Sequence, residues 1–238
     1  MNKDTFLKYL EDLDIEITQE KLEKLEIYAN FLLEYNTHTN LTAIKEIDEV
    51  YLKHFYDSLM LTNYIDLSKY KSLVDIGTGA GFPGVVLKIF FPHIQLVLID
   101  SNNKKITFLK ELIEKLSLSE VEVLNIRSED YAKDHKDAYD IVTARAVTSM
   151  PILSELCLPL VKVGGYFIPL KGDVTEELGL ANNIITELKG KIESINEFNL
   201  PIENAKRTII KIKKEAETPD KYPRSYDKMK KALKKLTK

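Results

Sequence analysis

Residues Asp75–Gly84 read DIGTGAGFPG and directly follow the apolar pair Leu73 and Val74. An acidic residue at the end of a buried strand, then alternating glycines and a helix, is typical of α/β folds that bind a nucleoside cofactor. Glycine allows left-handed backbone and a close approach of the main chain to a ligand. Because Gly79-x-Gly81-x-x-Gly84 also satisfies the dinucleotide fingerprint, this stretch alone leaves two cofactor classes open.

Length and composition are those of an ordinary globular protein. The 238 residues are 44% hydrophobic and 30% charged, with a net charge of −3. The single cysteine, Cys157, excludes an internal disulfide and suits a reducing compartment. Residues Met1–Asp4 have no apolar signal core, and no run approaches the roughly 18 apolar residues of a membrane span. We therefore expect a cytoplasmic enzyme without membrane contact.

Positive charge is concentrated at the C-terminal end. Residues 219–238 hold eight Lys or Arg against two Asp, which leaves the rest of the chain at −9. A cationic segment on an acidic body indicates that the tail contacts a polyanion. The alternative is a solvated, partly disordered terminus.

Three segments differ in their apolar pattern. Residues 1–66 predict a helical extension, with one helix beginning near Thr18 and another over His54–Leu61. Residues 67–214 alternate short apolar runs with amphipathic helices, which is typical of a parallel sheet. Residues 215–238 are the basic tail, with a helix expected over Ser225–Leu236. The fold class is therefore α/β, Rossmann-like, with a mostly parallel seven-stranded sheet and helices on both faces.

Local signals set the expected boundaries within the sheet region. A helix opens near Pro151 and is expected to end at Gly164-Gly165. Asp173 with Glu176 resembles a capping box at the start of the next helix. The expected strands are Ser72–Ile76, Gln95–Asp100, Val121–Ile126, Tyr139–Ala144 and Tyr166–Leu170, then an antiparallel pair of Ile192–Asn199 and Arg207–Lys213.

Two features favour S-adenosylmethionine over a nicotinamide coenzyme. Asp75 lies where it can approach the amino-acid group of the cofactor, directly or through water, and its carboxylate would repel a pyrophosphate. The strand after Gly164-Gly165 and the closing pair match methyltransferases. Asp100 suits a ribose ligand in either class. The histidines and the cysteine lack zinc-ligand spacing, so we expect no metal.

Further motifs occur in order along the chain. They are Asn40–Thr42, His54–Leu59, Asp75–Gly84, Leu98–Ser101 with Lys104, Lys105, Phe108 and Leu109, Arg127–Glu129, Thr143–Val147, Gly164-Gly165 with Lys171-Gly172, and Lys221–Arg224. In their order and spacing they resemble the bacterial small-subunit ribosomal RNA methyltransferase G family over nearly the whole length.

The resemblance implies methyl transfer from S-adenosylmethionine to N7 of a guanine in the 530 loop of 16S rRNA, nucleotide 527 in the usual rRNA numbering. The implied partner is 16S rRNA, in the 30S subunit or its assembly intermediate, and we expect a monomer. The expected cofactor-binding residues are Asp75, Gly77, Gly79, Phe82, Asp100, Ser128, Glu129 and Arg145. The expected RNA contacts are Asn40, His54, Lys221 and Arg224.

Guanine N7 carries a free lone pair, so the site needs no general base and acts by positioning and electrostatics. We expect Arg127, Arg145 and Lys171 on the carboxyl side of the sheet, contacting phosphate or guanine O6. Lys171 taken alone is better explained as an ordinary surface cation. His54 and Asp57 fit equally well a lid over the cofactor and a tie between the extension and the main domain.

Three other functions remain open at this point. The first is an S-adenosylmethionine-dependent methyltransferase with another substrate, which would not need the cationic tail. The second is a non-catalytic rRNA-binding assembly factor, although the retained cofactor motif disfavours it. The third is an NAD-dependent oxidoreductase, for which we find no hydride-handling residue.

Overall fold

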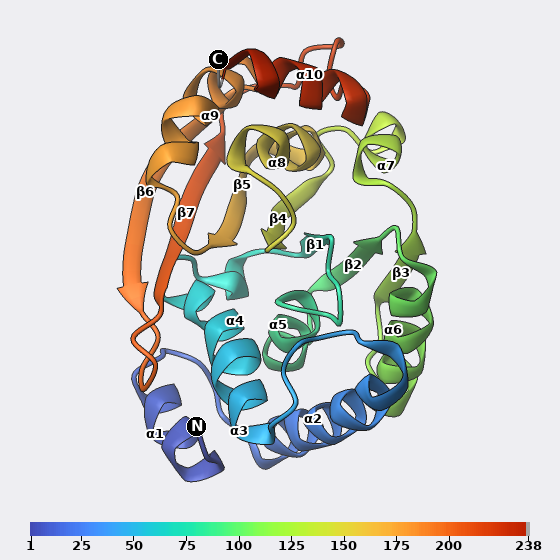
Figure 1. Cartoon of the computed structure of the whole chain (residues 1–238), viewed down its shortest axis with the longest axis vertical. Helices are drawn as coiled ribbons and strands as arrows, with labels where there is room; N and C mark the ends of the chain where they lie inside the picture. The colour runs from blue at the N-terminus through green and yellow to red at the C-terminus, as the bar shows by residue number, and fades with distance from the viewer. Residues whose placement is uncertain (237–238) are drawn as a thin grey trace.

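The computed structural model describes residues 1–236, and a seven-stranded sheet lies at its centre (Figure 1). The strand order is β3-β2-β1-β4-β5-β7-β6, in which β7 runs opposite to the other six strands. This confirms the mostly parallel Rossmann-like sheet. The strands are β1 (Ser72–Ile76), β2 (Gln95–Asp100), β3 (Val121–Asn125), β4 (Tyr139–Arg145), β5 (Val161–Lys171), β6 (Gly190–Asn199) and β7 (Lys206–Lys214).

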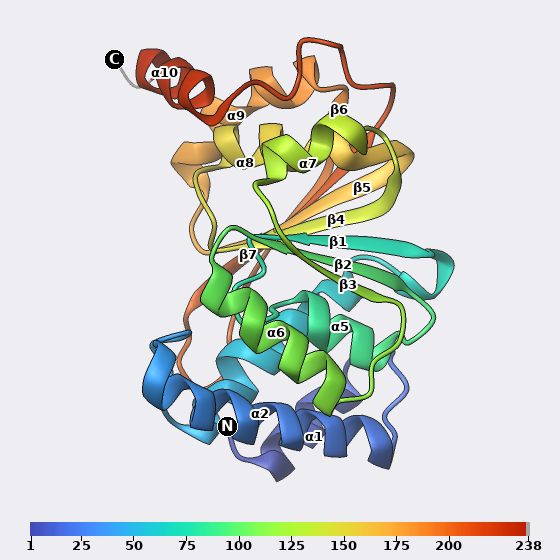
Figure 2. The ribbon, with the colours of Figure 1, turned by 90° about the vertical axis from the view of Figure 1, so that its right-hand side faces the viewer.

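Helices cover both faces of the sheet (Figure 2). One face is covered by α5 (Gly84–Phe90) and α6 (Asn103–Lys115), with the N-terminal helices packed outside them. The other face carries α7 (Ser128–Asp134), α8 (Met150–Cys157), α9 (Thr175–Glu187) and α10 (Tyr226–Leu236). Within residues 1–236, no helix combines the length and the apolar character needed to cross a membrane.

The N-terminal helices are α1 (Lys3–Glu11), α2 (Gln19–Thr39) and a continuous helical segment over residues 47–63. That segment consists of α3 (Ile47–Glu49), a π-helical stretch (Val50–Tyr56), α4 (Asp57–Leu59) and a 3₁₀ turn (Met60–Asn63). Thr18 caps α2 as expected, since its side chain accepts a hydrogen bond from the N–H of Lys21.

Strand β1 shows how the two cores arise. Leu73 points into the core beneath the N-terminal helices, whereas Val74 and Ile76 point into the core beneath α8. A strand buried on both faces therefore has adjacent apolar residues, as Leu73 and Val74 show. Phe6 of α1 and Leu25 of α2 belong to the first core, so the N-terminal extension packs into the same apolar interior as the sheet.

The helix that opens near Pro151 does not extend to Gly164-Gly165. Helix α8 ends at Cys157, and the glycine pair lies inside β5. The pairing of β4 with β5 shifts register next to these glycines, and a Cβ at Gly165 would lie 2.5 Å from the carbonyl oxygen of Asp140. The pair therefore forms a bulge where two backbones approach closely, and not a helix stop.

Two other local expectations also need correction. Helix α9 has Val174 at its N-cap without a side-chain bond, and Asp173 instead accepts from the N–H and hydroxyl of Thr175. This is a turn before the helix, so the expected capping box is wrong. Helix α7 was not predicted, because its seven residues are too short and polar to show helical spacing.

Helix α2 reaches the glycine-rich loop through Tyr28. The Tyr28 hydroxyl donates to the carbonyl oxygen of Ala80, and its ring stacks on Phe82 with centroids 5.1 Å apart. Tyr28 has no exposed surface. Because the Ala80 carbonyl lies in a buried contact, losing its donor has a full desolvation cost.

We predict that Tyr28→Phe lowers the free energy of unfolding in urea by about 1–3 kcal/mol. Tyr35→Phe is the control, since the Tyr35 hydroxyl makes an exposed contact of 3.4 Å with Glu111. That variant is expected to stay within about 0.5 kcal/mol of the wild type. Equal effects of the two substitutions would contradict this view of the loop.

Candidate active site

The loop between β1 and α5 exposes backbone at the carboxyl end of the sheet. Gly77 and Gly79 have φ values of +64° and +63°, in the left-handed region that favours glycine. A Cβ at Gly77 would lie 2.6 Å from Cγ2 of Val147, so a larger residue would require the Val147 side chain to move. The N–H of Gly79 donates to Oδ2 of Asp100 at 3.1 Å, which links this loop to the end of β2.

Asp75 lies beneath the loop and not in the wall of a cavity. It is 0% exposed, and its Oδ2 accepts from the Thr78 hydroxyl and the Gly84 N–H, both at 2.8 Å. Within residues 1–236, Oδ1 has no hydrogen-bond partner. Burial raises the pKa of this carboxyl to about 7, against the lowering effect of the two bonds. Asp75 therefore holds the glycine loop in shape.

Three neighbouring cavities follow the carboxyl edge of the sheet. The outer cavity (about 280 Å³) has Asp100, Ser128 and Glu129 in its lining. The loop cavity (about 200 Å³) is lined by the glycine loop with Phe82 and His54, and the cationic cavity (about 370 Å³) lies between α4 and the ends of β4, β5 and β7. Ala146 lines all three and has a φ of +54°.

The outer and loop cavities suit S-adenosylmethionine. Asp100 lines the outer cavity at the end of β2, where a carboxylate can accept hydrogen bonds from ribose hydroxyls. Its Oδ1 already accepts from the N–H of Asn102, and the Lys105 ammonium is 3.3 Å from Oδ2. Gly77 lines both cavities, so its narrow backbone lies where the two meet. The residues present thus fit the cofactor.

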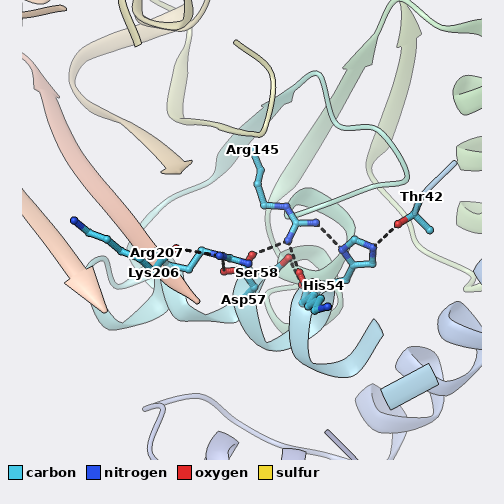
Figure 3. Close-up of polar contacts among 8 residues, drawn as sticks. Thr42, His54, Asp57, Ser58, Arg145, Lys206 and Arg207 are labelled. Carbon is cyan, nitrogen blue, oxygen red and sulfur yellow. Dashed lines mark hydrogen bonds and ion pairs between the residues drawn. The ribbon is translucent and has the colours of Figure 1, made fainter. Parts of the chain in front are cut away.

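A polar network connects the N-terminal helices to the end of β4 (Figure 3). The Arg145 guanidinium donates from Nη1 to Asp57 Oδ2 at 3.0 Å and from Nη2 to Nδ1 of His54 at 2.9 Å. The other carboxylate oxygen of Asp57 accepts from Nε of Arg207 at 3.2 Å. One carboxylate therefore holds two arginines that are distant in the sequence.

His54 is the bridge between this network and the loop after α2. Its Nδ1 accepts from Arg145, so Nε2 carries the hydrogen and donates to the Thr42 hydroxyl at 3.1 Å. The ring also stacks on Phe82, with centroids 4.1 Å apart. Burial, and then the positive charge of Arg145, lower the pKa of His54 to about 3. His54 is therefore neutral at physiological pH.

The cationic cavity contains four basic side chains and one carboxylate. Arg145 and Lys171 meet there, as expected from their places at the ends of β4 and β5. The Lys171 ammonium donates to the Thr148 carbonyl oxygen and pairs with Glu177, both at 2.8 Å. The remaining charged residues of its lining are Lys53, Asp57 and Arg207.

Arg127 does not join this group. It precedes α7 and lines the outer cavity, with 60% of its side chain exposed and its guanidinium 3.8 Å from Glu129. Ser128 and Glu129 are buried beside it, and the Ser128 hydroxyl donates to the carbonyl oxygen of Leu156. These three residues lie near the expected cofactor and away from the cationic cavity.

The other expected RNA contacts lie outside the three cavities. Asn40 ends α2 in the left-handed region at φ +52° and is exposed. Lys221 pairs with Glu187 on the surface. The guanidinium of Arg224 is occupied by the buried carboxylate of Glu155, with a shortest contact of 2.5 Å. An RNA contact by these residues stays a prediction.

Sequence reasoning missed two residues of the site. Arg207 is the second residue of β7 and was expected only as part of that strand, although Asp57 holds it in the lining of the cationic cavity. Tyr226 lines the outer cavity from the C-terminal helix. Tyr226 lies two residues after the Lys221–Arg224 motif in the basic tail, and this position could have indicated it as a site residue.

The low pKa of His54 predicts a pH-dependent stability. Between pH 3 and pH 6.5 the unfolded chain binds a proton at this residue and the folded chain does not, so this contribution rises with pH. Asp75 acts oppositely between 3.8 and 7, because its folded carboxyl keeps a proton that the unfolded one releases. The two contributions oppose each other in the wild type.

Comparison with His54→Asn isolates the first contribution. The difference in unfolding free energy, wild type minus variant, should increase by up to about 1.4 kcal/mol per pH unit between pH 4 and pH 6. Urea unfolding at several pH values measures it, with His93→Asn on the surface as the control. A difference that does not change with pH would show that His54 is not held neutral.

Comparisons with known proteins agree with this geometry. The family model for rRNA small subunit methyltransferase G matches residues 21–209. The chain is 46% identical over 227 residues to Ribosomal RNA small subunit methyltransferase G of Bacillus licheniformis, and equally so to that of Bacillus subtilis. Each alignment covers 94% of this chain and 95% of the relative.

Solved structures show the same fold at low identity. A SAM-dependent O-methyltransferase from Thermotoga maritima aligns with a TM-score of 0.51 and 18% identity, over 76% of this chain and 71% of that one. M. jannaschii TYW2 in complex with AdoMet aligns with a TM-score of 0.52 and 12% identity, over 84% and 79%. The resemblance seen in the motifs is confirmed: the chain belongs to the rRNA small subunit methyltransferase G family and is an S-adenosylmethionine-dependent methyltransferase.

Proposed function

We propose that this enzyme methylates N7 of a guanine in the 530 loop of 16S rRNA, nucleotide 527 in the usual numbering. The proposal rests on two adjoining cavities, one lined by the glycine loop and the other by cationic side chains. His54, Arg145 and Ala146 line both the loop cavity, which suits the methyl donor, and the cationic cavity. A base in the cationic cavity would therefore lie next to the cofactor.

The cationic cavity has the size and charge for a nucleotide. Its volume of about 370 Å³ falls in the range of small-molecule sites, and basic side chains exceed acidic ones in its lining. A base must leave its stack to enter such a cavity, and phosphates on either side favour cations near the entrance. Arginine suits both tasks, because its planar fork binds phosphate and stacks on bases.

Methyl transfer to guanine N7 requires that the base be placed next to the methyl group, and it requires no proton transfer. The bound cofactor supplies an electrophilic methyl group on its sulfonium sulfur. Guanine N7 attacks with its own lone pair. Neutral His54 accepts a hydrogen bond from Arg145 and donates one to Thr42, so both of its ring nitrogens are already used. Within residues 1–236 no cluster of His, Cys, Asp or Glu could hold a metal ion.

The expected site residues other than Asp75 and His54 then have the following roles. Asp100 and Glu129 would hold the ribose and the adenine, with Ser128 shaping that end, while Gly77, Gly79 and Phe82 would line the donor. Arg145 and Lys171 would contact guanine O6 or phosphate, and Arg127 would contact the RNA at the outer cavity. Asn40, Lys221 and Arg224 would lie along the bound RNA. The natural partner would be 16S rRNA within the 30S subunit or its assembly intermediate, bound by a single copy of the chain.

The decisive experiment uses labelled S-adenosylmethionine with 30S subunits, free 16S rRNA and 50S subunits. Borohydride and aniline treatment then cleaves the RNA at any 7-methylguanine. We expect one labelled and cleavable guanine in the 530 loop. Label on the 50S subunit, or label that aniline does not cleave, would refute the assignment, and no label at all would favour a non-catalytic assembly factor.

Two variants should separate the two sides of the site. Asp100→Asn is expected to weaken S-adenosylhomocysteine binding about tenfold, because a charge-assisted hydrogen bond to ribose is lost. Arg207→Gln should leave that affinity within about twofold and lower the single-turnover methylation rate about tenfold, since Arg207 lines only the cationic cavity. Isothermal titration and labelled-methyl assays measure the two quantities.

Lys206→Gln is the matched control, because its ammonium forms surface ion pairs with Glu197 and Asp173. Neither quantity should change in this variant. If Arg207→Gln weakened cofactor binding as much as Asp100→Asn did, the proposed division between donor and base sides would be wrong.

A further inference from the structure

The C-terminal segment returns to the cofactor end of the sheet. Tyr226, the first residue of α10, lines the outer cavity together with Asp100 and Glu129. It also lines a neighbouring cavity of about 460 Å³ between α7 and α10, where Arg127 is a second shared residue. The basic tail therefore contributes an aromatic ring to a site otherwise built by residues 76–156.

Two cations from different parts of the sequence lie near the Tyr226 ring. The Arg127 guanidinium lies 6.0 Å from the ring centroid, and the Lys230 ammonium, one turn further along α10, lies 4.7 Å from it. Such contacts favour one orientation of an aromatic side chain. The ring is half-buried and so keeps an accessible surface.

The backbone on both sides of Tyr226 is anchored. Two residues before it, Arg224 donates from its N–H and Nε to Glu155 Oε1, both at 2.8 Å, and Glu155 is 1% exposed on α8. Three residues after it, Met229 is buried in the core beneath α8 and α9. Removing Arg224 would leave the buried Glu155 carboxylate unpaired, which is strongly unfavourable. This ion pair therefore fixes the start of α10 on the body of the enzyme.

We propose that Tyr226 binds the adenine of S-adenosylmethionine and that α10 thereby completes the cofactor site. An aromatic ring beside Glu129 offers the base a stacking surface, and every base has a π-face to meet it. The Arg224–Glu155 pair acts as the anchor that positions this ring. The inference depends on the cofactor alone, so it stands or falls independently of the guanine assignment.

The first test is titration with S-adenosylhomocysteine in the absence of RNA. Tyr226→Ala should weaken binding about tenfold, as expected for loss of one base–aromatic stack. Tyr226→Phe keeps the ring and should bind within about twofold of the wild type. Lys234→Ala, roughly 12 Å further along the same helix, is the control and should not change the affinity.

A second test uses fluorescence, because the chain contains no tryptophan. In Tyr226→Trp the new indole should be quenched as S-adenosylhomocysteine is added, with a midpoint equal to the dissociation constant from titration. In Lys234→Trp the emission should not respond. This readout decides the question even if Tyr226→Ala fails to fold.

Wild-type affinity in folded Tyr226→Ala would overturn the proposal. So would unchanged emission from Tyr226→Trp at saturating S-adenosylhomocysteine. A loss of affinity in Tyr226→Phe equal to that in Tyr226→Ala would also overturn it, because the hydroxyl and not the ring would then be the binding group.

Discussion

One carboxylate, that of Asp57, ties the N-terminal helices to the sheet at the active site. It is 4% exposed, and its two oxygens accept from Arg145 at the end of β4 and Arg207 near the start of β7 (Figure 3). A carboxylate loses its hydration when it is buried, and only close cations and hydrogen bonds compensate for that loss. Both arginines therefore stabilise the position of the helical segment 47–63 against this edge of the sheet. Its position in turn places His54 on Phe82 and forms one side of the cationic cavity.

This arrangement explains how the polar groups of the site position one another. His54 is buried next to a fixed positive charge, so it stays neutral and serves as a bridge between Thr42 and Arg145. Asp75 is buried beneath the glycines and shapes their loop. Each group holds a neighbour in position, which is what the proposed methyl transfer to guanine N7 would require. The C-terminal helix fits the same pattern, since the Arg224–Glu155 pair positions Tyr226 at the outer cavity.

The sequence predicted the sheet well, because its central strands are buried on both faces and contain short apolar runs. The bounds of β1 and β2 were predicted correctly, and so was the antiparallel closing pair apart from one or two terminal residues. Gly164-Gly165 was misread as a helix stop, since a bulge that needs close backbone approach has the same glycine signal as a turn. The motifs indicated His54, Phe82, Arg145 and Lys171 as site residues, and the structure places them around the loop and cationic cavities. The Asp57–Arg207 contact could not be predicted, because it spans 150 residues of sequence and depends on how the N-terminal segment packs on the sheet.

A double-mutant cycle on Asp57 and Arg145 tests the central claim most directly. The free energy of unfolding in urea would be measured for the wild type, Asp57→Asn, Arg145→Gln and the double variant. Asp57→Asn leaves the Arg145 charge without its carboxylate, and Arg145→Gln leaves Asp57 with Arg207 as its remaining cation, so each single change should cost about 3–5 kcal/mol. The double variant should cost at least about 2 kcal/mol less than the two single losses together, within the range of coupling seen for contacting charges. Losses that add to within about 0.5 kcal/mol would show that the two residues act independently and would contradict the account.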